Sequence, residues 1–347
     1  MLHPTAATLL SGAVFGSGLT LSGVASPRIM KDQFALHDFH MLATFLTASA
    51  ASTLIIATHN YATTDPKKNI SARPPKALGW LGSFKYDGNI IGGAMVGLGM
   101  SMTGACPGTI LVQAVAGSGK GRGLAASAFL AGAVWARWGP SVVTAPRIQA
   151  EDSPPATVMT TTGWSVSTVI LWYELAIAAA IASILALKLH GHSAVMHPVV
   201  GGMLIGLGQL ASVTLSRSSV GVSSVYPDCG SMLCNLYRTE KDQEKRTLLA
   251  LPNSLVFACG LMAGSWLALR MFPAARIAMT ATAMPGTEPS LLTTVVGGFV
   301  LVFGARLAGG CTSGHGISGM ATMGLSSFVT VFSMFGTALL SSYFMSW

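Results

Sequence analysis

The chain has 347 residues, of which 51% are hydrophobic and only 9% are charged. Soluble domains carry roughly 25% charged residues, so this composition excludes a water-soluble globular protein. The net charge of +8 does not indicate nucleic acid, because the basic residues lie in loops between apolar runs, where membrane topology requires them. We therefore predict an all-α, polytopic helical membrane protein that contacts the lipid bilayer and no nucleic acid.

Apolar runs of about 20 residues, long enough to cross a bilayer, recur along the chain. In chain order they are His40–Thr58, Gly123–Trp138, Ser165–Leu187, Leu248–Leu269 and Leu325–Phe344. Polar loops are predicted at Tyr61–Lys76, Arg147–Thr157 and Arg238–Arg246. The N-terminal stretch "MLHPTAATLLSGAVFG" lacks the basic region of a cleavable signal peptide, so it is expected to be part of the fold.

A glycine-rich element lies between the apolar runs. It is clearest in "GGAMVGLGMSMTGACPGT", from Gly92, and in "GGFVLVFGARLAGGCTSGH", from Gly297. In both copies the cysteine follows the first glycine by 14 positions, which places Cys106 and Cys311 at equivalent sites. This equal spacing indicates an internal repeat.

Two further segments fit the same frame. One starts at Gly12 and has Ala25 at the cysteine position, and the other starts at Gly201 and has Leu215 there. Four copies predict a single transmembrane domain, residues 1–347, built from two pseudo-repeat halves of about 1–160 and 161–347.

Loop charge predicts how these elements enter the membrane. Basic residues lie on both flanks of the Gly92 element and of the Gly201 element, and basic flanks prefer the cytoplasmic side. Both elements are therefore expected to begin and end on that side, whereas the Gly12 and Gly297 elements are expected to enter from the other. This order predicts inverted repeats whose broken or re-entrant half-helices meet near the midplane and line a site there.

A helix that begins inside the membrane exposes unpaired N–H groups, which favour an anion. Pro107, Gly108 and Thr109 follow Cys106, and proline suits the first turn of a new helix. A thiol at such a helix start can meet a soft anionic sulfur ligand. Because small membrane cysteines are often apolar filler, packing is the competing interpretation for Cys106, as it is for Cys311.

The Cys311 element offers further polar groups. Thr312 and Ser313 follow the cysteine and are expected to cap the second half-helix with their hydroxyls. Arg306, five residues before Cys311, is expected to place positive charge beside the path, although an arginine near the interface also snorkels. His315 fits either a ligand or proton carrier, or a hydrogen-bonded structural histidine.

The remaining reactive residues give weaker signals. Cys259 is interpreted as filler, and Cys229 and Cys234 lack the second ligand pair of a zinc site, so no metal is predicted. Glu174 is costly in lipid and should face the protein interior or the interface; its role stays open.

At "GARLAGGCTSGHGISGMA" and "GACPGT" the chain resembles the YeeE/YedE family of sulfur-transport membrane proteins. The resemblance implies an hourglass-shaped helical protein in which thiosulfate passes along cysteines through transient S–H···S contacts. Cys106 and Cys311 match two of these cysteines. The family's thiosulfate transporters also use a cysteine in the N-terminal repeat, where this chain has Ser22, Ala25 and Ser26, so another sulfur species remains an alternative substrate.

The resulting interpretation is a permease for thiosulfate or a related sulfur-containing anion, without cofactors, in the plasma membrane. It leaves room for a sulfur-carrier or sulfurtransferase partner at the cytoplasmic face. The alternative from another class is a membrane thiol oxidoreductase or persulfide transferase that uses the same cysteines, although no C-x-x-C motif and no quinone, haem or flavin motif is present. A scaffold subunit without transport is a third interpretation.

Overall fold

The structure, a computed structural model, describes residues 3–65, 68–78, 84–117, 119–142, 155–191, 195–238, 251–280 and 290–345. These residues form helices and connecting segments, and no strand occurs among them. Six described segments are long and apolar enough to cross a bilayer: His40–Ala62, Asp87–Ala116, Val166–Ala186, Pro198–Ser216, Asn253–Met271 and Leu325–Met345. The predicted all-α polytopic membrane protein is confirmed.

Four of the five predicted spans coincide with these segments. The fifth, Gly123–Trp138, lies within a helix but is not among the candidate spans, because glycine, serine and Arg137 dilute its apolar residues. The bent pair Leu291–Leu307 and Thr312–Thr322, with an angle of 44° between its parts, is a further candidate. Most of the loops predicted at Arg147–Thr157 and Arg238–Arg246 lie outside the described residues.

Four units of the chain share one order of elements: a long helix, a break, a shorter helix and a second long helix. The first unit contains α1 (Pro4–Leu21), α2 (Pro27–Phe34) and α3 (His40–Ala62), and the second contains α4 (Asp87–Thr103), α5 (Pro107–Ala116) and α6 (Gly119–Val142). The third contains α9 (Pro198–Ala211) with η2 (Ser212–Ser216), then α10 (Val225–Arg238) and α11 (Asn253–Met271). The fourth contains α13 (Leu291–Leu307), η4 (Thr312–Gly319) with η5 (Met320–Thr322), and α14 (Leu325–Met345). The first long helix of each unit carries one of the four glycine-rich segments.

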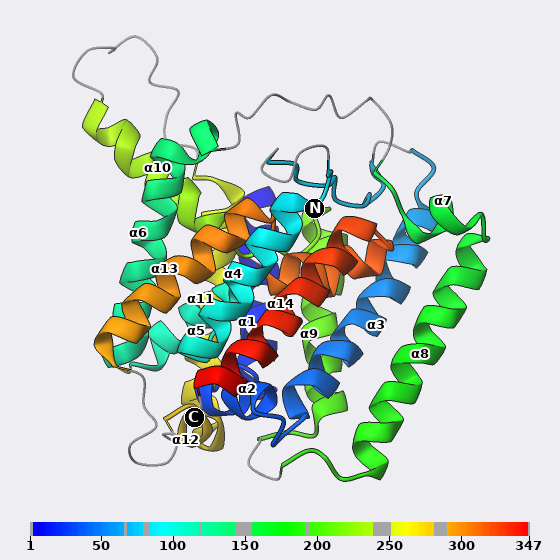
Figure 1. The fold of residues 1–347 in the computed structure, drawn as a ribbon, viewed down its shortest axis with the longest axis horizontal. Helices are drawn as coiled ribbons and strands as arrows, with labels where there is room; N and C mark the ends of the chain where they lie inside the picture. The colour runs from blue at the N-terminus through cyan, green and yellow to red at the C-terminus, as the bar shows by residue number, and fades with distance from the viewer. Residues whose placement is uncertain are drawn as a thin grey trace.

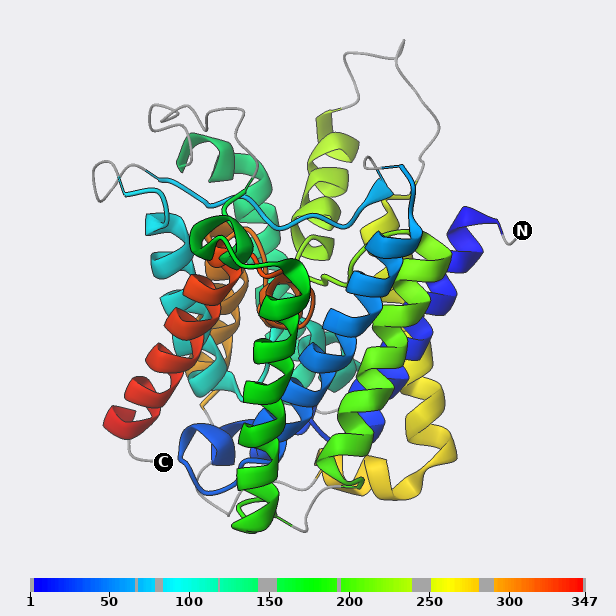
Figure 2. The ribbon, with the colours of Figure 1, turned by 90° about the vertical axis from the view of Figure 1, so that its right-hand side faces the viewer.

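The direction of these helices differs from the charge-based prediction. In Figures 1 and 2, α1 and α4 run from the upper to the lower end of the molecule, whereas α9 and α13 run upward. The re-entrant form predicted for the Gly92 element is not confirmed, because α4 and α5 together form one candidate span of 30 residues. Loop charge is a bias summed over the whole chain and does not place each short loop. The symmetry that relates the two halves stays a prediction.

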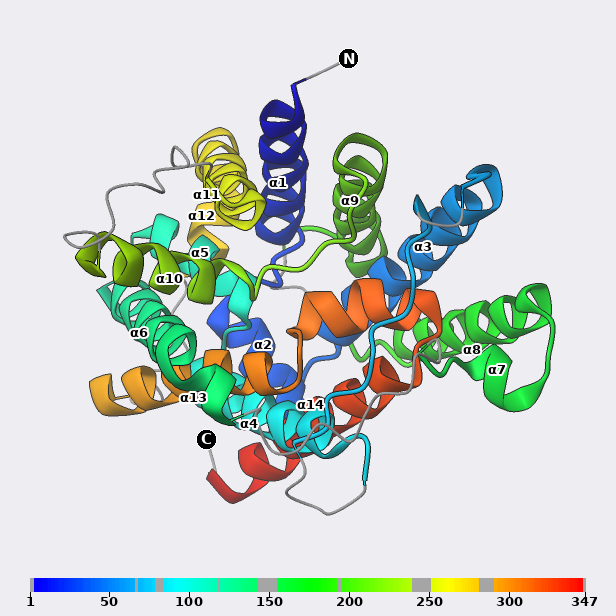
Figure 3. The ribbon, with the colours of Figure 1, turned by 90° about the horizontal axis from the view of Figure 1, so that it is seen from above.

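Seen from above, the long helices form a ring (Figure 3). The short helix α2 and the broken element η4 lie inside it. Two helices fall outside the four units between α6 and α9: α7 (Val158–Thr162) and α8 (Val166–Ala186). α8 stands at the edge of the ring, held to α3 by a hydrogen bond of 2.7 Å between Tyr173 and Ser49. α12 (Pro273–Thr280) connects the third unit to the fourth.

The glycines allow the long helices to approach closely. A methyl group on Gly12 of α1 would lie 2.1 Å from the carbonyl oxygen of Phe257 in α11, and one on Gly264 would lie 2.0 Å from the carbonyl oxygen of Ala13. The same holds between α4 and α14, where a methyl group on Gly97 would lie 2.1 Å from the carbonyl oxygen of Met334. The repeated glycine pattern is thus a packing pattern of small residues at helix interfaces.

Candidate functional site

Cys106 caps the start of α5 from an extended backbone, as predicted, and Pro107 follows it at the first helical position. Its backbone N–H donates to Thr109 Oγ1 over 2.8 Å, and the Thr109 hydroxyl lies 3.5 Å from the cysteine sulfur. The turn is held from outside as well, because the Tyr226 hydroxyl donates to the Pro107 carbonyl over 2.5 Å. These bonds fix the direction in which the thiol points.

Cys311 caps η4 and is fully buried. Its sulfur lies 3.3 Å from Ser313 Oγ, and the backbones of Gly314, Val222 and Ser223 lie close to it. The predicted capping by the Thr312 and Ser313 hydroxyls is not found, since neither oxygen accepts a hydrogen bond from a backbone N–H of the described residues. Ser313 contacts the sulfur instead, and Thr312 donates to the thioether of Met100 over 3.4 Å.

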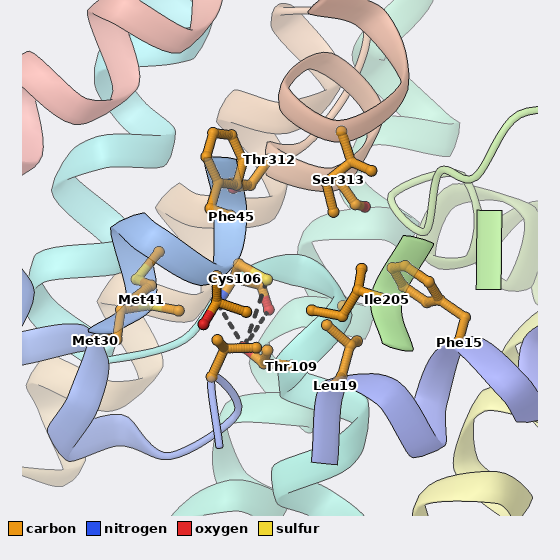
Figure 4. A pocket seen from close by; sticks show the side chains of 14 residues that line it. Phe15, Leu19, Met30, Met41, Phe45, Cys106, Thr109, Ile205, Thr312 and Ser313 are labelled. Carbon is orange, nitrogen blue, oxygen red and sulfur yellow. Dashed lines mark hydrogen bonds between the residues drawn. The ribbon is translucent and has the colours of Figure 1, made fainter. Parts of the chain in front are cut away.

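A cavity of about 50 Å³ lies between the two broken elements (Figure 4). One water needs roughly 10–15 Å³ by this kind of measure, so the cavity holds a few water-sized groups. Cys106, Gly108 and Thr109 line it from α5, and Thr312 and Ser313 line it from η4. The rest of the wall is mainly apolar: Phe15, Leu19, Val24, Met30, Met41, Thr44, Phe45, Ile205 and Ile317. Five of the predicted site residues therefore line the same cavity.

In the first unit, the position equivalent to Cys106 lies one residue later than the sequence alignment placed it. Ser26, and not Ala25, caps α2, and Pro27 follows it as Pro107 follows Cys106. The two short helices lie close together, since the Gln113 amide donates to the carbonyl oxygens of Ala25 (3.0 Å) and of Gly104 (3.1 Å). A buried hydroxyl thus stands where the second unit has a thiol.

His315 lies outside the cavity wall, and its environment favours the structural interpretation. Its ring is buried, Nε2 lies 3.1 Å from the Ala308 carbonyl oxygen, and Nδ1 lies 3.0 Å from Ser327 Oγ. Because a carbonyl only accepts, Nε2 carries the proton and Nδ1 accepts from the serine. His315 therefore links the end of α13 to the start of α14.

Arg306 is half-buried on the last turn of α13. Its Nε is buried and has no hydrogen-bond partner among the described residues. The guanidinium interacts electrostatically with Asp228, Cys311 and Arg73. The role of Arg306 beside the path stays a prediction.

Arg73 and Lys76, whose sequence positions indicate only loop charge, also reach this region. Arg73 donates to the carbonyl oxygens of Gly314 and Gly309, each over 3.1 Å. The Lys76 side chain packs on Gly309, where φ is +79° and any side chain would collide with it. Burial lowers the pKa of Lys76, and repulsion from Arg306 and Arg73 lowers it further. Only the position of these residues in a basic loop hinted at the site.

Val222 was also missed, and it lies between the two cysteines. A methyl group on Gly108 would lie 3.5 Å from Val222 Cγ2 and 3.9 Å from Cys106 Sγ. The backbone of the same valine lies close to Cys311. This buried residue belongs to the loop before α10, where no sequence motif marks it.

The other reactive residues lie away from the cavity. All five cysteines are free; Cys229 is half-buried on α10, Cys234 and Cys259 are exposed. Within the described ranges, no group of three or more His, Cys, Asp or Glu residues is arranged to hold a metal. Glu174 lies on α8, where its buried Oε1 has no hydrogen-bond partner among the described residues.

Comparison with known proteins adds one match. A family model described as sulphur transport matches residues 24–340, nearly the whole chain. No protein of curated function matches. The matched range includes both cysteine elements and the complete second and third units, together with the first unit from Val24 onward and the fourth unit as far as residue 340 of α14.

Proposed function

Because this chain belongs to the YeeE/YedE family of sulphur transport proteins, we propose that it carries a small sulfur-containing anion, with thiosulfate as its first candidate, across the bilayer past Cys106 and Cys311. Membership of a transport family fits a carrier better than a catalyst. The observation that carries the proposal is the cavity between the two breaks, to which α5 contributes Cys106 and η4 contributes Thr312 and Ser313.

The chemistry of the cavity suits a soft anion held briefly. A thiol is a weak hydrogen-bond donor, so one contact holds the ligand without trapping it. Met30 and Met41 add polarizable thioethers to the wall, and the apolar remainder disfavours strongly hydrated ions. Hydroxyls of Thr109, Thr312 and Ser313 supply the few hydrogen bonds that orient a ligand.

The two cysteines have different surroundings, which gives the path a direction. Cys106 faces a mainly apolar cavity, whereas Cys311 lies near Arg73 and Arg306. The end of the molecule that carries the basic residues Lys68, Arg73, Lys76 and Lys85 is predicted to face the cytoplasm. A sulfur carrier or sulfurtransferase at that face would collect the anion after it passes Cys311.

The test is uptake of labelled thiosulfate, sulfite, sulfide and sulfate by cells that make this chain. We expect thiosulfate uptake to exceed that of control cells severalfold, with little uptake of sulfate. Disulfide and persulfide formation on the cysteines should be followed in parallel. Thiosulfate consumption that releases sulfite and leaves a persulfide on Cys311, without accumulation of intact thiosulfate, would instead establish the persulfide transferase.

A further inference from the structure

We propose that Arg73 forms a binding site for a small oxyanion beside Cys311, with Arg306 as a second charge. This proposal rests on the proposed transport function. It extends that function, because it adds a charged binding site to a path of weak thiol contacts. It is separate from the cavity, since neither arginine lines that space.

The hydrogen bonds of Arg73 leave one side of its guanidinium available. Nε donates to the Gly314 carbonyl and Nη1 to the Gly309 carbonyl, which anchors the group to the broken element. Nη2 donates no hydrogen bond to any residue that the structure describes. A guanidinium anchored in this way presents its remaining N–H donors in a fixed orientation, which suits the oxygens of a sulfonate or sulfate group.

Two glycines leave room beside these donors. A methyl group on Gly221 would meet only Arg73 Nη2, at 3.3 Å, and Gly314 Cα, at 3.9 Å. A methyl group on Gly314 would lie 3.3 Å from Nη2 and 3.9 Å from Cys311 Sγ. The guanidinium and the thiol therefore both lie within 4 Å of one point beside Gly314, close enough for a single small anion to contact both.

The positive charge in this region also favours a bound anion. Arg73 and Arg306 interact with each other and with Cys311, and Lys76 interacts with both arginines. Neither arginine forms an ion pair with a carboxylate of the described residues, and Asp228 acts on Arg306 only at longer range. Burying a cation without a counter-charge is costly, so a bound oxyanion would offset that cost.

The competing explanation is that Arg73 only clamps the turn through its two carbonyl bonds. Gly221→Ala separates the two roles, because its methyl group occupies the space beside Nη2 and leaves both carbonyl bonds in place. Arg73→Gln removes the charge itself. Arg137→Gln is the matched control, since Arg137 is exposed on α6.

The experiment measures equilibrium binding of thiosulfate and of inorganic sulfate to the purified full chain, together with its unfolding temperature. We expect Arg73→Gln and Gly221→Ala each to raise Kd for both anions by about tenfold or more. Arg137→Gln should change Kd by less than about twofold, as expected for a screened surface charge. Gly221→Ala should keep the wild-type unfolding temperature.

Wild-type affinity in Gly221→Ala would overturn the site, whether or not Arg73→Gln folds. The transport proposal is judged separately by uptake. Normal thiosulfate uptake with no effect of either variant on binding would reject the oxyanion site alone. Oxyanion binding that depends on Arg73 in a protein without sulfur uptake would keep the site and reject the transport proposal.

Discussion

The Tyr226 hydroxyl donates a hydrogen bond of 2.5 Å to the carbonyl of Pro107, a residue 119 positions earlier in the chain. The bond joins α10 of the third unit to the half-helix that begins after Cys106. Tyr226 is fully buried. The orientation of the Cys106 turn therefore depends on a residue from the other half of the chain.

Tyr226→Phe should loosen this turn. The change removes one hydroxyl and leaves the Pro107 carbonyl without that donor, which costs about 1–3 kcal/mol in a buried site. We expect a lower unfolding temperature and a reduced rate of thiosulfate uptake. Tyr343→Phe is the control, because Tyr343 is 82% exposed. Equal behaviour of the two variants would show that the bond does not support the site.

Thr109→Val tests the capping of the Cys106 half-helix. Valine keeps the shape but loses the oxygen that accepts from the Cys106 N–H and contacts its sulfur. Loss of a helix cap costs about 0.5–2 kcal/mol. We expect a lower unfolding temperature and faster alkylation of Cys106 by a small neutral thiol reagent, since the thiol is less restrained. Thr58→Val, on the exposed part of α3, should leave both quantities unchanged, and an unchanged alkylation rate in Thr109→Val would contradict the role of this cap.

Val222→Ala tests whether the valine separates the two cysteines. The shorter side chain removes contacts next to Gly108 and costs about 1–2 kcal/mol. We expect severalfold faster thiosulfate uptake, with more leakage of sulfate. Val213→Ala is the control, because Val213 is equally buried but lies in a separate apolar cluster with Ile56 and Ala321. Slower uptake in Val222→Ala would show that the valine shapes the path and does not obstruct it.

Thiosulfate uptake should depend on pH in the alkaline range, because Lys76 loses its proton there. Burial and the neighbouring arginines lower its pKa, so the folded protein releases this proton at a lower pH than the unfolded chain. Stability therefore rises with pH between the lowered pKa and the ordinary lysine value of about 10.4, while the site loses one positive charge. We expect KM for thiosulfate to increase through that window in the wild type.

The matched variants for this prediction are Lys76→Arg and Lys76→Gln. Arginine stays charged throughout, so KM should remain flat across the same window. Glutamine should give a high KM at every pH. A wild-type alkaline rise that persists in Lys76→Arg would assign the titration to another group.

The sequence predicted the parts of the site that depend on local order along the chain. The spacing from Gly92 to Cys106 and from Gly297 to Cys311 predicted two cysteines at helix starts, and the structure confirms both as caps. The same spacing holds in the first copy, because 14 positions after Gly12 lies Ser26, the N-cap residue of α2. The placement of Ala25 at the cysteine position was therefore one residue too early.

The residues that the sequence did not reveal reach the site through tertiary packing. Arg73 bonds to carbonyl oxygens more than 230 positions later, with sequence separations of 236 and 241 residues. Val222 lies in an apolar loop, and no sequence motif there marks it as part of a site. Loop charge also predicted that the Gly92 element returns to its starting side, whereas α4 and α5 form one candidate span by length and composition and Lys120 lies in the next helix.

The central claim, that thiol chemistry carries the anion, is tested most directly by thiosulfate uptake in Cys106→Ser and Cys311→Ser. Serine keeps the size of the side chain and donates stronger hydrogen bonds to hard oxygens, but it loses the soft, polarizable sulfur. Cys259→Ser, on the exposed face of α11, is the control. With all three proteins present in the membrane at wild-type amounts, we expect uptake to fall to the background level in Cys106→Ser and Cys311→Ser and to stay normal in Cys259→Ser. Wild-type uptake in both site variants would contradict the thiol path.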